Sequence, residues 1–220
     1  MAQGYVRSSD LPQVIPVFPL PGATMLPRGQ LPLNIFEPRY LNMIDDAMAG
    51  DRVIGMIQTV GPTGERPPLM RVGCAGRITS FAETSDGRYL ITLTGIARFR
   101  IATELQVKTP YRQVRADFDP YAHDLDGPDP YASFDRERFF EVLAPYLGSR
   151  GLDIDWETAR GAPAEALINS LSMGLPFEPA EKQALVEAIT LGERCEALTA
   201  LLHIDGAGSA SDEDLPPRVQ

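Results

Sequence analysis

The sequence has few of the residues that most often build metal, disulfide and catalytic sites. Among 220 residues it has 2 cysteines, 2 histidines, 2 lysines and 1 tryptophan. Cys74 and Cys195 stand far apart, whereas a disulfide scaffold needs several pairs and a zinc site needs closely spaced ligands. We therefore expect reduced thiols, no metal and no cofactor, in a cytoplasmic protein.

Long apolar runs are also missing. The start, Met1 to Asp10, lacks the basic region of a signal peptide, and the apolar stretch after it is broken by Pro16 and Pro19. No window approaches the ~18–20 consecutive apolar residues of a membrane span. The sequence therefore predicts neither a leader nor a membrane partner.

Catalytic motifs are absent as well. The sequence has no GxxxxGK[ST], no GxSxG and no HExxH pattern. His123 falls in an acidic segment that we expect to be mobile, and His203 falls near the end of the last helix, so neither is a well-held base. Lys108 and Lys182 stand in polar surroundings that keep an amine protonated. We expect no catalytic residue, no metal ligand and no enzymatic activity.

Charge is abundant, and it is unevenly spread. Thirty acidic against twenty basic residues give a net charge of −10. Residues 1–112 hold 12 basic and 9 acidic side chains, whereas residues 113–220 hold 8 and 21. The excess of acid argues against nucleic acid as a partner, because phosphate binding draws on Lys and Arg. The change of sign suggests that the chain has two parts.

The first half reads as strands and turns around one helix. Glu37 and Pro38 suit a helix start and Gly50 suits its end, so residues 38–48 are the expected helix. Residues 20–32 read as a structured loop, and Asp86-Gly87 marks a hairpin. The expected strands are 13–18, 52–60, 71–81, 89–99, 100–107 and 111–118. Such a set predicts a small closed or half-closed barrel.

The second half reads as helices after a linker rich in Asp and Pro. Apolar stripes follow a possible cap at Asp135 and recur in residues 163–175, 179–189 and 192–204, which predicts a small bundle. The sequence thus divides into a barrel part, an acidic linker, a helical bundle and a disordered acidic tail, with the ranges 1–118, 119–132, 133–205 and 206–220.

One proline-rich stretch is specific enough to identify a family. Residues 17–40 and several positions downstream resemble the N-terminal domain of the Lon ATP-dependent protease. The matching residues are Phe18, Pro19, Leu20, Leu26, Pro27, Leu31, Pro32, Leu33, Ile35, Phe36, Glu37, Pro38, Arg39, Tyr40, Met43, Gly95, Arg98, Phe99, Pro110, Tyr111, Leu175, Pro176 and 181–183. The resemblance covers residues 13–204. Asn34 departs from the family's usual histidine.

The resemblance implies an α+β fold in which a PUA-like β pseudo-barrel is followed by a small α-helical bundle. It also implies a free-standing substrate-binding domain without the ATPase and peptidase domains. The implied function is a non-catalytic module that binds unfolded polypeptide or a partner protein. Self-association stays open.

We expect a binding surface in the cleft between barrel and bundle, beside the proline-rich loop, because such a loop presents apolar groups at little entropic cost. Its candidate residues are Leu20, Pro21, Met25, Leu26, Leu33 and Phe36. A second set of motif residues is expected to be structural: Glu37, Arg39, Tyr40, Arg98 and Phe99. In that interpretation Arg39 pairs with Glu37, and Phe36 and Tyr40 anchor the helix to the barrel. The methionines are expected to fill the barrel core.

Two other functions stay open at this stage. An RNA-binding PUA-like module is suggested by the architecture and by the slight basic excess of residues 1–112. A small-molecule enzyme with an unrecognised site would need a clustered pair of perturbed acids in the cleft.

Overall fold

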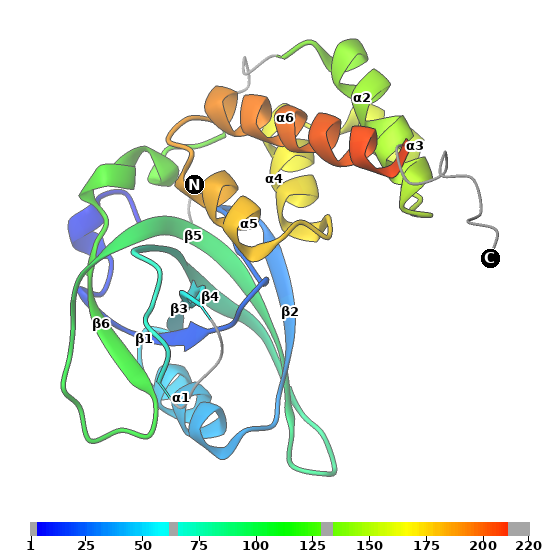
Figure 1. The fold of residues 1–220 in the computed structure, drawn as a ribbon. Helices are drawn as coiled ribbons and strands as arrows, with labels where there is room; N and C mark the ends of the chain where they lie inside the picture. The colour runs from blue at the N-terminus through cyan, green and yellow to red at the C-terminus, as the bar shows by residue number, and fades with distance from the viewer. Residues whose placement is uncertain (1–3, 62–65, 129–133, 211–220) are drawn as a thin grey trace. The chain divides into compact units, whose positions relative to one another are not determined.

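The computed structural model describes residues 4–61, 66–128 and 134–210, with side chains up to Ile204. The elements of its first part are η1 (Ser8–Asp10), β1 (Val14–Pro19), β2 (Gln30–Ile35), α1 (Pro38–Ala49), β3 (Val53–Ile57), β4 (Val72–Glu83), β5 (Tyr89–Glu104), β6 (Arg112–Asp117) and η2 (Asp119–Leu125). Then come α2 (Arg136–Ser149), α3 (Trp156–Gly161), α4 (Ala164–Gly174), α5 (Pro179–Glu187) and α6 (Leu191–Ala210). The predicted α+β class is confirmed (Figure 1).

The strands form one six-stranded sheet that closes on itself. Its order is β2-β5-β4-β3-β1-β6, and a further pairing of β5 with β6 completes the ring. β1 and β3 are parallel, whereas all other pairs are antiparallel. β5 is long enough to pair with β2, β4 and β6, and bulges in its ladders with β4 and β6 let the strands bend around the barrel. β2 pairs with β5 alone, so it lies outside the closed ring.

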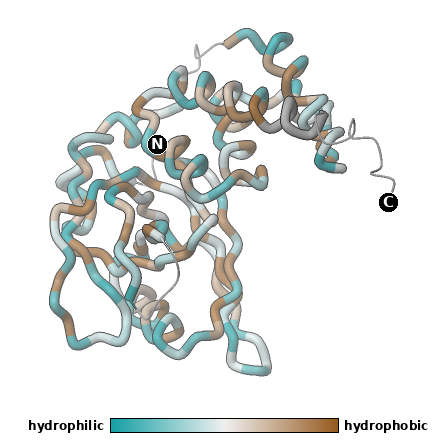
Figure 2. Tube along the Cα trace, in the orientation of Figure 1, coloured by the Kyte–Doolittle hydropathy of each residue, from teal (hydrophilic) through white to brown (hydrophobic). Residues whose placement is uncertain are grey.

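Two apolar clusters fill the barrel. One surrounds Ile15, Phe99 and Val114, and the other lies under α1 and contains Met43 and Ile44. Figure 2 shows apolar residues alternating with polar ones along the strands, as expected for walls with one buried face. Met25, Met43 and Met56 are buried in the second cluster, as expected of core methionines, whereas Met48 and Met70 are only partly buried against the two clusters.

Helix α1 begins and ends where the sequence predicts. Glu37 is the N-cap with Pro38 at the first helical position, and Gly50 is the C-cap. Two tyrosines hold the helix to the barrel: Tyr89 donates a hydrogen bond to Asp45 over 3.0 Å, and Tyr111 donates one to Asp46 over 2.6 Å. α1 covers one end of the barrel, while α5 lies at the other end (Figure 1).

Several boundaries differ from the prediction. β2 occupies residues that we expected partly as loop, since Pro32 reads as a strand breaker; a proline is tolerated here because β2 is an edge strand. Residues 89–104 form one strand, β5, instead of two. The short helix α3 carries too few residues to show a periodic pattern and was not expected.

The chain packs into two compact units that depart from the predicted domain ranges. Of the described residues, the barrel unit comprises 4–61, 66–128 and 169–187, and the helical unit comprises 134–168 and 188–210. Residues 119–125, expected as linker, form η2 in the barrel unit, and residues 169–187, expected in the bundle, also belong to the barrel unit. α6 runs to Ala210, so the first residues of the expected tail are helical; positions 129–132 and 211–220 lie outside the described residues.

The helical unit has its own local organisation. Asp135 caps α2 by accepting a hydrogen bond from the Arg138 N–H, as the sequence predicts. The Arg136 guanidinium donates to the carbonyls of Ala159 and Ala162 at the end of α3, which satisfies carbonyls that a helix end leaves free.

Candidate binding groove

A groove of about 370 Å³ opens on the barrel unit, where the motif stretch turns from strand into helix. We call it the motif groove. It combines the end of β1, the end of β2, the start of α1 and the entry to β6. Its lining residues are Phe18, Pro19, Leu20, Pro21, Leu33, Asn34, Phe36, Glu37, Arg39, Tyr40, Thr59, Pro67, Pro110, Tyr111 and Arg112.

Four of the six predicted surface residues line this groove: Leu20, Pro21, Leu33 and Phe36. The other two do not, since Met25 and Leu26 are each 1% exposed and belong to the core. Gly76 accounts for the place of Met25, because a Cβ there would lie 2.5 Å from the Met25 methyl carbon. The sequence of a proline-rich stretch does not show which of its apolar side chains are buried.

Phe36 is a large apolar side chain of the groove that stays 62% exposed. Ile35 before it is buried, so strand alternation sends the next side chain outward. The expectation that Phe36 anchors α1 to the barrel is therefore wrong. Tyr40 is buried and packs edge-on against Phe18, with ring centroids 4.3 Å apart.

Burial raises the pKa of the Tyr40 phenol above its ordinary value. Burial and the hydrogen bond to Asp46 raise the pKa of Tyr111 to about 12. Both tyrosines are therefore neutral at physiological pH. They offer the groove aromatic surface without charge.

An exposed ion pair stands at the rim. The Arg39 Nε and Nη2 atoms both donate to one oxygen of Glu37, over 2.9 and 2.7 Å. The Arg39 guanidinium also lies over the Tyr40 ring, 4.6 Å from its centroid. Both partners remain close to half exposed, so the pair contributes at most about 1 kcal/mol to stability.

Arg112 holds the opposite wall. Its Nε and Nη2 atoms donate to the two oxygens of Glu104 over 2.9 and 2.7 Å, and its Nη1 atom donates to the Pro67 carbonyl over 2.7 Å. Arg66 reaches the same carboxylate over 2.7 Å. The hydrogen bond from Arg112 lowers the pKa of Glu104. Arg112 is thus neutralised and positions the Pro67 segment.

One polar group in the groove wall has no partner among the described residues. Thr59 is buried, and its hydroxyl makes no hydrogen bond within the described part of the chain. A buried hydroxyl without a partner costs about 1–3 kcal/mol.

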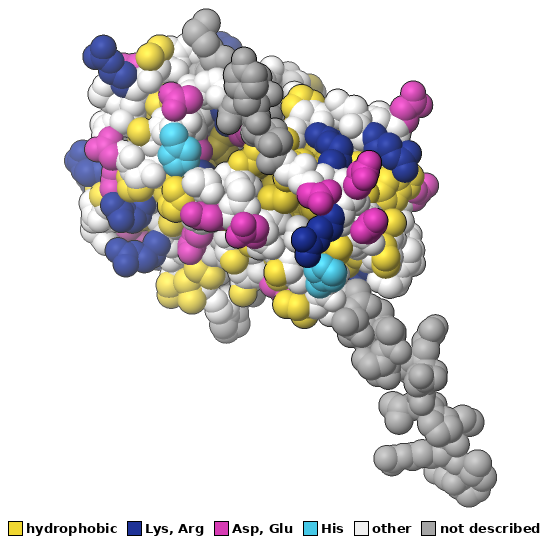
Figure 3. Space-filling view, turned by 90° about the horizontal axis from the view of Figure 1, so that it is seen from above, with side chains coloured by type: hydrophobic (Ala, Val, Ile, Leu, Met, Phe, Trp, Pro, Cys, Tyr) yellow, Lys and Arg dark blue, Asp and Glu magenta, His cyan; other side chains and the backbone are white. Residues whose placement is uncertain are grey.

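The lining has the chemistry of a contact surface. It contains no histidine and no cysteine, and its one carboxylate is paired with Arg39. Within the described residues no cluster of three His, Cys, Asp or Glu side chains could hold a metal. No helix in that part of the chain is long and apolar enough to span a membrane. On the face shown in Figure 3, basic and acidic side chains are interspersed.

Arg98, another motif residue, is buried elsewhere in the barrel unit. It bonds Asp124 in η2 through its main-chain N–H at 2.9 Å, its Nε at 2.9 Å and its Nη2 at 2.8 Å. Its Nη1 atom donates to the Val186 carbonyl at the end of α5 over 3.1 Å, and the guanidinium lies 4.4 Å from the Tyr121 ring centroid. We call these residues with His123 the Arg98 cluster.

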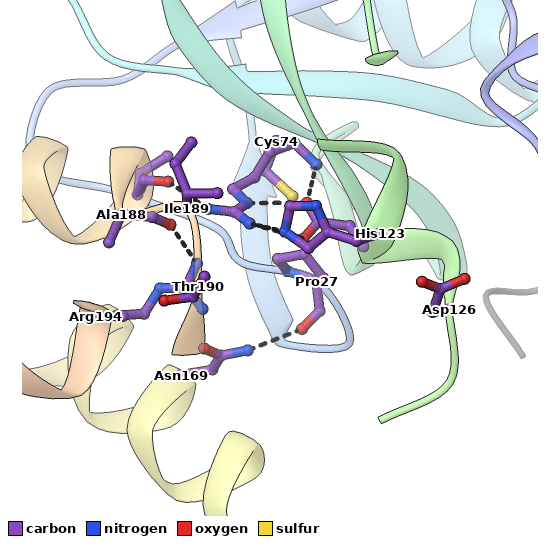
Figure 4. Close-up of polar contacts among 12 residues, drawn as sticks. Pro27, Cys74, His123, Asp126, Asn169, Ala188, Ile189, Thr190 and Arg194 are labelled. Carbon is purple, nitrogen blue, oxygen red and sulfur yellow. Dashed lines mark hydrogen bonds and ion pairs between the residues drawn. The ribbon is translucent and has the colours of Figure 1, made fainter. Parts of the chain in front are cut away.

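The Arg98 cluster corrects two expectations. Asp124 falls in the range predicted as an acidic linker, yet it is buried and ion-paired. His123 was expected in a mobile linker, yet its Nε2 atom lies 3.2 Å from Arg98 Nη2 (Figure 4). A sequence segment rich in acidic residues does not show which of its carboxylates pairs with an arginine far away in the chain.

Lys182 is less exposed to water than its polar sequence neighbours indicate. It is buried on α5, where burial lowers the pKa of its amine, and its Nζ atom donates to the Met173 carbonyl over 3.2 Å. Nearby on α4, Asn169 donates to the Pro27 carbonyl over 3.2 Å (Figure 4). Asn169 therefore joins α4 to the proline-rich loop, and Lys182 joins α5 to α4.

Sequence reasoning missed part of the groove. Thr59, Pro67 and Arg112 come from segments that no motif singled out, and they meet the motif stretch only because β1 pairs with both β3 and β6. Pro110 and Tyr111 were noted as family residues, which was the available signal.

Comparisons with known proteins agree on one family. The family model described as the ATP-dependent protease La (LON) substrate-binding domain matches residues 14–203. "Lon protease 2" of Myxococcus xanthus is 32% identical over 117 residues, which are 52% of this chain and 14% of that protein. "Lon protease" of Syntrophus aciditrophicus is 32% identical over 113 residues, 49% of this chain and 14% of that protein. The matched part is thus about a seventh of these relatives.

Solved structures show the same fold at low identity. A Lon N-terminal domain protein from Xanthomonas campestris has a TM-score of 0.60 at 19% identity, covering 85% of this chain and 97% of that one. The N-terminal domain of Mycobacterium avium complex Lon protease has a TM-score of 0.60 at 18% identity, covering 86% and 98%. With the family model matched over most of its length, the chain belongs to the Lon substrate-binding domain family.

Proposed function

We propose that this protein binds unfolded polypeptide or an extended segment of a partner protein in the motif groove, without catalysing a reaction. Membership of a substrate-binding domain family supports recognition of protein. We further propose that it acts in the cytoplasm.

The observation that carries the proposal is the exposed Phe36 in a groove walled by aromatic rings and prolines. Burying an exposed aromatic side chain is among the largest gains that a binding surface can offer. The phenols beside it are neutral, and the Tyr111 ring is fixed by its bond to Asp46. A surface fixed before binding loses little side-chain entropy when a segment arrives.

The binding test uses a fluorescently labelled, permanently unfolded polypeptide and the full chain. We expect saturable binding by fluorescence polarisation and at least a ten-fold weaker Kd for Phe36→Ala. Val6→Ala is the matched control, because Val6 is 70% exposed and does not line the groove. Equal losses in the two variants, or no binding by the wild-type chain, would sink the proposal.

The same assay separates the alternative functions. A labelled tRNA in place of the polypeptide tests the RNA-binding module. A protein that binds RNA would change the polarisation at low salt and lose that change at high salt, and we expect no such change. Incubation of the polypeptide with the chain, followed by mass spectrometry, tests for catalysis. We expect the polypeptide to be recovered with its mass unchanged.

A further inference from the structure

We propose that the motif groove selects apolar segments that carry an acidic residue beside the apolar anchor, and that Arg39 is the residue that reads this acid. The inference rests on the proposed function, because it names the class of segment that the same groove takes. The acid of the segment would replace Glu37 on Arg39.

The rim pair is built so that one partner is held and the other is not. The guanidinium of Arg39 lies on the Tyr40 ring, and Tyr40 is buried against Phe18. The Glu37 side chain packs on no aromatic ring among the described residues. It contacts Arg39 through one carboxylate oxygen. A competing carboxylate therefore finds the cation in place and displaces only the looser partner.

Replacing Glu37 by a carboxylate of the bound segment costs little free energy. The two side chains are 45% and 43% exposed, and ion pairs this exposed contribute little to stability. Glu37 returns to water when it is displaced, so no charge is left buried. Arg112, the other guanidinium of the groove, is committed to Glu104 and to the Pro67 carbonyl and is not offered to a ligand.

The charges of the lining leave one cation for a ligand. Arg112 is paired with Glu104, and Arg39 is paired with Glu37, the one carboxylate of the lining. Once Glu37 is displaced, Arg39 is the charge that a bound segment meets at the rim. A basic residue beside the anchor would have to pair with Glu37 in place of Arg39. Its positive charge would then lie close to the guanidinium on the Tyr40 ring, which repels it.

The experiment compares three labelled peptides with one apolar core containing Leu, Pro and Phe and with flanks of Glu, Gln or Lys. Kd values are measured on the full chain by fluorescence polarisation. We expect the Glu peptide to bind about two- to five-fold more tightly than the Gln peptide, the range of exposed ion pairs, and the Lys peptide to bind most weakly. The preference should shrink at about 0.5 M salt because of screening.

Two variants assign the effect. Arg39→Gln should bring the Glu and Gln peptides to equal Kd values. Glu37→Gln should tighten binding of the Glu peptide about two-fold, since Arg39 is then unoccupied. Arg88→Gln is the matched control: Arg88 forms an exposed ion pair with Asp86 over 2.9 Å, also two positions apart, and does not line the groove. It should leave all three Kd values unchanged.

The outcomes separate this inference from the proposed function. If Phe36→Ala weakens all three peptides while the wild-type chain binds them equally, the groove binds peptide and the acid preference is overturned. Tighter binding of the Lys peptide, or an acid preference that survives Arg39→Gln, also overturns it. If no peptide binds, the proposed function itself fails.

Discussion

The motif groove and the Arg98 cluster lie in the same barrel unit and use the same kinds of residue, yet they treat polar groups in opposite ways. Around Arg98, polar atoms are buried and matched with partners on η2 and α5. In the groove, an aromatic ring and an ion pair face water and a threonine hydroxyl lacks a partner within the described residues. A closed network favours one conformation, whereas an exposed apolar ring leaves free energy to be gained when a ligand covers it.

The largest expected effect comes from opening the Arg98 cluster. Arg98→Ala leaves Asp124 buried without its partner, so we expect the free energy of unfolding to fall by about 3–5 kcal/mol. Arg100 is two positions along the same strand, and its pair with Asp117 is partly exposed; Arg100→Ala should cost about 1 kcal/mol or less. Urea unfolding of both variants measures the contrast, and equal losses would contradict it.

A steric test of the same closed region comes next. A Cβ on Gly95 would lie 2.0 Å from the Leu26 carbonyl oxygen, so Gly95→Ala must shift the backbone of the proline-rich loop. We expect a loss of about 1–3 kcal/mol. At Gly148 in α2 nothing lies within 4 Å of such a Cβ, so Gly148→Ala should be neutral or stabilising by up to about 1 kcal/mol. Thermal melts compare the two.

A smaller effect is expected where groove and barrel meet. Tyr111→Phe removes the hydrogen bond to Asp46, so we expect a loss of about 0.5–1.5 kcal/mol at neutral pH. Because the pKa of Tyr111 is raised to about 12, its contribution is full below the ordinary phenol pKa of about 10 and disappears as pH rises through 12. The difference between wild type and variant, measured by urea unfolding from pH 7 to pH 11.5, should therefore shrink above pH 10. A constant difference would argue against this hydrogen bond.

The smallest effect on stability is expected at Phe36, the residue with the largest expected effect on binding. Phe36 is mostly exposed, so Phe36→Ala should change the free energy of unfolding by no more than about 0.5 kcal/mol. A change above about 2 kcal/mol in urea unfolding would show that the ring supports the fold, and the contrast between the two regions would then be lost.

Local signals in the sequence predicted the parts of the fold that depend on neighbouring residues. The ends of α1 follow from Glu37, Pro38 and Gly50, and the β4–β5 turn follows from Asp86 and Gly87. The family resemblance supplied the fold class, and four of the six binding residues predicted in the motif stretch line the groove.

The rest depends on contacts between distant segments. The burial of Asp124 requires Arg98, and the inward turn of Met25 requires the space that Gly76 leaves beside it. Pro32 prevented the prediction of β2 as a strand, because a proline usually interrupts a strand. It is compatible with an edge strand, but the sequence does not show which strand lies at the edge of the sheet. None of these contacts produces a recognisable pattern in the local sequence.

The pairing of β1 has a consequence for the order in which the barrel forms. Val14 pairs with Arg115, about a hundred positions further along the chain, whereas β3, β4 and β5 pair with strands that follow them directly. The early hairpins can form, and β1 can pair with β3, while the chain is still being synthesised, but the pairing of β1 with β6 must wait for β6 to emerge. Closing so long a loop is slow, so the β1–β6 seam is the last part of the barrel to close.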